Sequence, residues 1–100
     1  MNRSPAAGNR LARRFARHRI MTAIENELLA ALRALEAAVQ QVAAGQPADL
    51  AERFARIESL AARLGPETPR DLRHYLAMRS YQKARLWLER AAARSAAPEA

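Results

Sequence analysis

The chain has 100 residues, enough for one domain, and 50% of them are apolar but only 5% aromatic, so its core must be mainly aliphatic. It contains no cysteine, which excludes a disulfide framework and thiolate chemistry and leads us to expect a cytoplasmic protein. The net charge is +7, and no apolar run approaches the roughly 20 residues needed to span a bilayer.

Glycine and proline divide the chain into three stretches of helix-forming residues. The sequence therefore predicts an all-α fold with helices over about 9–44, 47–64 and 69–95. We expect either a three-helix up-down-up bundle or a helical hairpin with a long first helix. Residues 9–96 would form a single helical domain, and residues 1–8 and 97–100 would be flexible tails.

The first predicted helix begins at Asn9, a common N-cap residue, and ends at Gly45 in a left-handed conformation. Spacings of three and four residues place the apolar side chains of its C-terminal half on one stripe, typical of a core or a coiled-coil seam. The stripe comprises Met21, Ile24, Leu28, Leu32, Leu35, Val39 and Val42. Because the seam fades near His18, a break in the helix there is the alternative.

The second and third predicted helices share a proline-led start. Pro47 and Asp49 open the second helix, whose apolar face is predicted to contain Leu50, Phe54, Ile57, Ala61 and Leu64. Thr68-Pro69-Arg70-Asp71 opens the third in a similar way. That helix has apolar residues on two roughly opposite sides, so one partner helix pair cannot cover both.

The predicted helices would differ in length, at about 54, 26 and 40 Å. Two ends would then overhang the bundle and expose apolar surface, which soluble monomers usually avoid. We therefore expect an oligomer, most simply a two-fold dimer. The candidate interface consists of Leu11, Phe15, Ile20, Met21, Met78, Tyr81, Leu86, Trp87 and Leu88.

Positive charge is concentrated toward the two ends of the sequence. Residues 1–24 contain six arginines and no acid, residues 25–67 have a net charge of −3, and residues 68–95 have a net charge of +5. Clustered guanidinium groups neutralise phosphates and release counterions. The candidate contacts to phosphate or to an acidic partner protein are Arg10, Arg13, Arg14, Arg17 and Arg19.

Other interpretations of this basic segment stay open. It has the composition of an amphipathic helix on an anionic membrane surface, of a solvated helix end, or of an organellar transit peptide. In the third predicted helix Tyr75, Tyr81 and Trp87 alternate with basic residues, but their spacing of six spreads them around the helix. That spacing favours packing over base stacking.

Chemical motifs are sparse. Asp71 and His74 lie three residues apart, a spacing at which a carboxylate can orient an imidazole, but Asp71 also suits the helix start. We find no phosphate-binding glycine loop, zinc pattern or nucleophile elbow, and we assign no catalytic, cofactor-binding or metal-binding residue.

The favoured hypothesis is a non-enzymatic helical module that self-associates and mediates protein-protein interaction or regulation. The alternative is a basic nucleic-acid-binding accessory protein that uses the arginine-rich start of the first helix.

Overall fold

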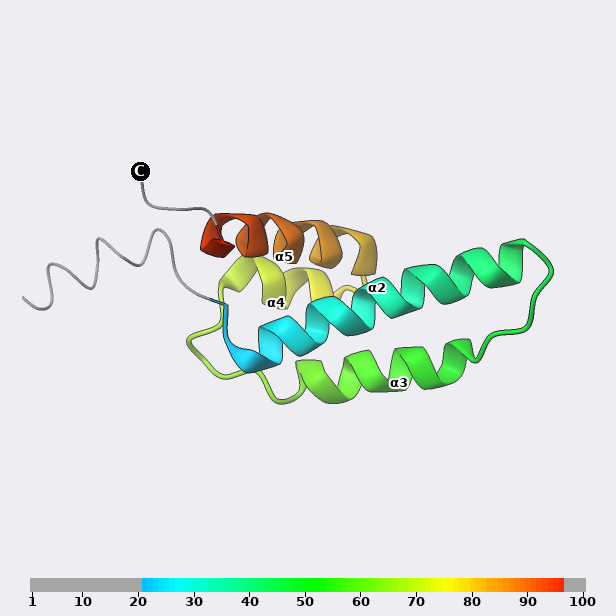
Figure 1. Cartoon of the computed structure of the whole chain (residues 1–100). Coiled ribbons are helices and arrows are strands. Elements are labelled where there is room, and N and C mark those ends of the chain that lie inside the picture. The colour runs from blue at the N-terminus through cyan, green and yellow to red at the C-terminus, as the bar shows by residue number, and fades with distance from the viewer. Residues whose placement is uncertain (1–20, 97–100) are drawn as a thin grey trace, which may run out of the picture.

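The computed structural model describes residues 21–96, which form four helices and no strand. Labelled as in Figure 1, they are α2 (Ala23–Ala43), α3 (Leu50–Ala61), α4 (Arg70–Ala77) and α5 (Tyr81–Ala96). The chain turns back after each helix, so α2 and α3 form one antiparallel hairpin and α4 and α5 a second (Figure 1). The all-α prediction is confirmed, with α2 packed against both α3 and α5.

Helix α2 begins later than the sequence suggested. Thr22 is the N-cap, with an extended backbone at φ −74° and ψ 167°. Its Oγ1 accepts a hydrogen bond from Glu25 N at 3.1 Å, while Thr22 N donates to Glu25 Oε1 at 3.0 Å. This capping box marks the N-terminus of the helix, so the prediction of a helix that continues through residues 21–23 was wrong. The predicted start at Asn9 lies outside the described residues.

The C-terminal end of α2 confirms the prediction for Gly45, which has φ +85°. Gln46 N donates to Gln41 O at 2.8 Å and Gly45 N donates to Val42 O at 3.0 Å. These are the two hydrogen bonds of a Schellman motif. Helix α3 then starts at Leu50, with the Asp49 side chain accepting from Glu52 N at 3.0 Å.

The third predicted helix is in fact two helices. Arg79, with φ +58°, interrupts residues 69–95. Ser80 N donates to Tyr75 O at 2.8 Å and Arg79 N donates to Leu76 O at 3.1 Å, which repeats the Schellman pattern with arginine in the position that glycine usually holds. The chain therefore reverses into α5, and four helices replace the expected up-down-up trio within residues 21–96. The sequence hid this turn because it contains neither glycine nor proline between Pro69 and Pro98.

The core lies where the two hairpins meet. Its largest fully buried side chains are aliphatic residues of all four helices together with Glu25, whose carboxylate caps α2: Leu28, Leu32, Ile57, Leu60, Leu72, Leu88 and Glu25. The predicted stripe of α2 is buried only in part, because Val39 and Val42 are 46% and 45% exposed. Leu29 and Leu60, which the predicted faces omitted, are buried.

Truncation of the core should be costly. Leu60→Ala removes a side chain that is 0% exposed, and we expect the free energy of unfolding to fall by about 2–5 kcal/mol. The matched control is Leu86→Ala, whose side chain is 39% exposed and whose loss should cost below about 1 kcal/mol. Urea unfolding followed by circular dichroism measures both, and equal losses would contradict this assignment of the core.

Candidate functional site

The described residues do not include the arginine cluster that the sequence singled out. Arg10, Arg13, Arg14, Arg17 and Arg19 lie outside residues 21–96, as do the candidate interface residues Leu11, Phe15 and Ile20. The segment that contains them joins the described fold at Met21. That junction lies at the end of the molecule where α4 begins and α5 ends (Figure 1).

The remaining candidate interface residues have different environments. Met21 and Leu88 are buried in the core of the chain, at 6% and 0% exposure. In this folded form neither side chain is exposed to a partner, and their place in an interface stays a prediction. Tyr81 and Trp87 are partly buried against the core, whereas Met78 is 63% exposed.

Exposed apolar surface also gathers where the sequence did not predict it, at the far end of the α2–α3 hairpin. Val39, Val42 and Phe54 are all large exposed side chains, and we call this surface the hairpin tip. In Figure 1, α2 and α3 extend past the turn that joins α4 to α5, so neither α4 nor α5 covers this end of the hairpin. The Phe54 ring packs beside Tyr81, the first residue of α5, with ring centroids 5.9 Å apart.

A groove continues from the hairpin tip along the junction of α2 and α5. Its volume is about 320 Å³, and its apolar lining comes from Leu32, Leu35, Val39 and Tyr81. Polar side chains of both helices also line it: Glu36, Gln40, Gln82 and Arg85. Val39 thus belongs to both the groove and the tip, so the two form one continuous surface.

The α2 side of the hairpin tip also lacks charge. Residues 37–48, from the last turns of α2 through the connection to α3, include no acidic or basic residue, although 27% of the chain is charged. Because the net charge is +7, two copies repel each other at long range. Residues 37–48 add no repulsion between like charges where two tips meet.

Ion pairs join α2 to α5 beside the groove, and one of them lies in its lining. Arg85 Nε lies 2.9 Å from Glu36 Oε1, and Arg85 Nη1 lies 3.0 Å from Glu89 Oε2. Arg33 Nε lies 3.2 Å from the same Glu89 oxygen. Hydrogen bonds from Arg33 and then Arg85 lower the pKa of the Glu89 carboxyl below its ordinary value of 4.5. The alternating charges therefore fix α5 in register on α2.

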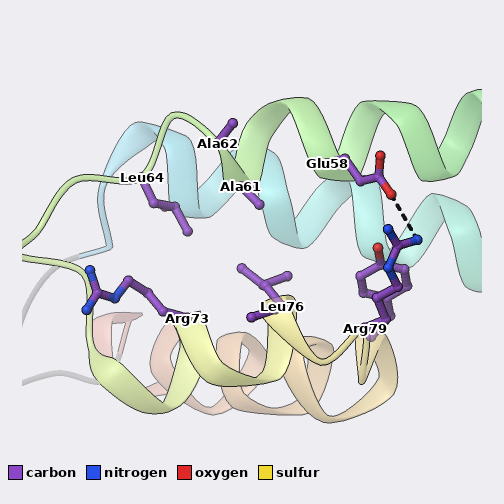
Figure 2. A pocket seen from close by; sticks show the side chains of 9 residues that line it. Glu58, Ala61, Ala62, Leu64, Arg73, Leu76 and Arg79 are labelled. Atoms are coloured by element: carbon purple, nitrogen blue, oxygen red, sulfur yellow. Dashed lines mark ion pairs between the residues drawn. The ribbon is translucent and has the colours of Figure 1, made fainter.

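A second groove, of about 400 Å³, separates α3 from α4 (Figure 2). Leu64, Leu76 and Ala61 lie along it, with Arg73 toward one end and Arg79 toward the other. Arg79 Nη1 spans the gap to Glu58 Oε2 at 3.0 Å, and both side chains are at least half exposed. Across this groove, the α4–α5 turn contacts α3 through a solvent-accessible ion pair and through the neighbouring contact of Phe54 with Tyr81.

The weak catalytic candidate gains no support from the geometry. Asp71 and His74 are both exposed, and no hydrogen bond joins them. Within residues 21–96 there is no group of three or more metal-ligating side chains. None of the described helices is both long enough and apolar enough to cross a membrane.

Comparison with known proteins does not place the chain in a family. No family model matches it, and no curated protein or solved structure shows significant similarity.

The ion pairs between α2 and α5 should make stability depend on pH. Because the folded-state pKa of Glu89 is lowered, its contribution to stability is present at neutral pH and is lost as the pH falls from about 4.5 through that lowered value. We expect Glu89→Gln to lower the urea midpoint at pH 7 and to flatten its fall between pH 5 and pH 3. An unchanged pH profile would contradict a role for this carboxylate in holding α5.

Proposed function

We propose that this chain is a non-enzymatic helical interaction module whose copies self-associate through the hairpin tip. The observation that supports it is the exposure of Val39 and Val42 within residues 37–48, which carry no charge, together with the exposed Phe54 of α3. Contiguous exposed apolar surface commonly marks a site of protein association. The cytoplasmic setting expected from the cysteine-free sequence is part of the same proposal.

A two-fold arrangement suits this surface best. In a symmetric dimer each tip meets the same tip of the partner, so an uncharged patch is complementary to itself. The valines of one copy would then cover those of the other, and Phe54 would lie at the margin. The start of α4 and the end of α5, with Arg70 and Arg94, would lie toward the opposite end of each copy (Figure 1).

Substitution of the two valines tests the proposal. Val39→Gln together with Val42→Gln keeps good helix formers on α2 but makes the tip polar. A dimer buries four half-exposed valines, two from each copy. Their replacement should reduce the free energy of association by about 3 kcal/mol and raise the dissociation constant about a hundredfold. Light scattering after size exclusion, over a range of protein concentrations, measures this change.

The matched control is Ala30→Gln, an exposed substitution in the N-terminal half of the same helix. It should leave the dissociation constant unchanged. A parent chain that stays monomeric at millimolar concentration, or a double variant that associates as strongly as the parent, would refute self-association through the tip.

Nucleic-acid binding is the second candidate, and one observation favours it. Five exposed arginines lie after α3, along α4 and toward the end of α5, and none forms an ion pair within residues 21–96: Arg63, Arg70, Arg73, Arg90 and Arg94. The arginine-rich N-terminal segment joins the fold at this same end (Figure 1). A basic surface of this kind would bind phosphate backbones without reading sequence.

Salt titration tests the second candidate. Affinity for a short duplex should fall steeply as the salt concentration rises. A variant with glutamine in place of five arginines should show a shallower plot of log binding constant against log salt concentration, by about 0.9 in slope for each phosphate that it no longer neutralises. The five positions are Arg10, Arg13, Arg14, Arg17 and Arg19. Arg53→Gln is the control, because this exposed arginine lies on α3 near the other end of the molecule. Fluorescence anisotropy measures both slopes, and a salt-independent affinity would exclude this function.

A further inference from the structure

The turn between α4 and α5 requires a left-handed backbone conformation at Arg79, which arginine adopts less readily than glycine. Arg79 has φ +58°, where the Cβ of an L-residue crowds the following carbonyl and lowers the population about tenfold relative to glycine. The equivalent position in the α2–α3 turn is Gly45, which has no Cβ to crowd. The second turn is therefore under strain that the first one avoids.

The same segment suits a different conformation. Residues 70–96 contain no glycine and no proline, so with Arg79 in a right-handed conformation they can form one helix of 27 residues, about 40 Å long. Apart from the packing of α5 on α2 and the backbone hydrogen bonds of the turn, only exposed side-chain contacts hold the turn closed. The exposed Arg79–Glu58 ion pair spans an open groove (Figure 2), and the contact of Tyr81 with Phe54 is partly solvent-accessible.

Straightening would remove α5 from its own chain's α2. Helices α4 and α5 run in opposite directions, so a helix continued along α4 would take α5 away from its place against α2 (Figure 1). Ala84, Leu88 and Ala91 would become uncovered, as would Leu28 and Leu32 of α2. A second straightened copy can restore all of this packing by reciprocal exchange, including the ion pairs of Arg85 and Glu89.

The position of the hinge favours such an exchange. Tyr81 follows the hinge directly and its ring lies 5.9 Å from that of Phe54, which belongs to the hairpin tip. Association of two tips would therefore bring the two hinges close together. Short, strained hinges are the ones that invite the swapping of an element between copies.

We propose that α5 is exchanged between two copies of this chain, with residues 78–80 as the hinge and the left-handed conformation of Arg79 controlling the balance between closed and exchanged forms. The inference rests on the proposed self-association, since the hairpin tip brings the copies together and α5 then locks them. Its partner is a second copy of the chain.

Cross-linking of two single-cysteine variants of the full chain tests the exchange. The parent has no cysteine, so Arg33→Cys in one variant and Glu89→Cys in the other are unique thiols. Their parent side chains touch across the α2–α5 junction. After the two variants are mixed, a short bismaleimide should join them into a covalent heterodimer. Each variant incubated alone is the control and should give far less dimer.

Two substitutions at the hinge form a matched pair. Arg79→Ala and Arg79→Gly both remove the ion pair with Glu58, but alanine favours a continuous helix whereas glycine favours the left-handed turn. Introduced into both cysteine variants, Arg79→Ala should raise the cross-linked fraction at least about tenfold above Arg79→Gly. Equal fractions in the two would overturn the proposal, as would the absence of heterodimer in the parent and in Arg79→Ala.

The experiment still tests exchange if one hinge variant fails to fold. If circular dichroism shows Arg79→Ala to be unfolded, the comparison of the parent with Arg79→Gly decides, because glycine must lower the cross-linked fraction. Light scattering separates this inference from the proposed function. If the parent forms a dimer that never cross-links between chains, exchange is refuted and association through the tip stands. If exchange persists after Val39→Gln and Val42→Gln, only the role of the tip is refuted and exchange stands.

Discussion

The described fold depends on burial of one side of α2. Leu28 and Leu32 are almost inaccessible to solvent, and α2 is the helix against which both α3 and α5 pack. Each fully buried leucine contributes roughly 1.5–3 kcal/mol, more than a single exposed ion pair at the helix surfaces. Helix α4 is held less directly, through α5, which leaves the groove between α3 and α4 open.

The α2–α3 and α4–α5 turns have the same backbone geometry but use different residues. Each reverses the chain through a left-handed residue and the same pair of backbone hydrogen bonds, but one uses Gly45 and the other Arg79. Arginine gains an ion pair with Glu58 there, yet a pair between exposed side chains contributes only about 0–1 kcal/mol. The strain of about 1–2 kcal/mol is thus not fully offset locally, and packing of α5 on α2 must supply the remainder.

The surfaces at the two ends of the described fold differ in kind. One end has exposed valines and no charge over residues 37–48, and the other has several exposed arginines and the junction with the basic N-terminal segment. Apolar, uncharged surface favours contact with another copy, whereas guanidinium groups favour anions. The two proposed functions therefore use separate surfaces and do not compete for the same residues.

The sequence by itself determined the helical class, the stop at Gly45 and much of the apolar stripe, because helix periodicity and a residue without Cβ leave local signals. It did not reveal the turn at Arg79, since no local signal marks an arginine that adopts a left-handed conformation. Nor did it show that Leu88 is buried while Val39 is exposed, although both lie on apolar faces. Those outcomes follow from where α5 folds back on α2, and only tertiary packing decides which part of an apolar stripe is covered.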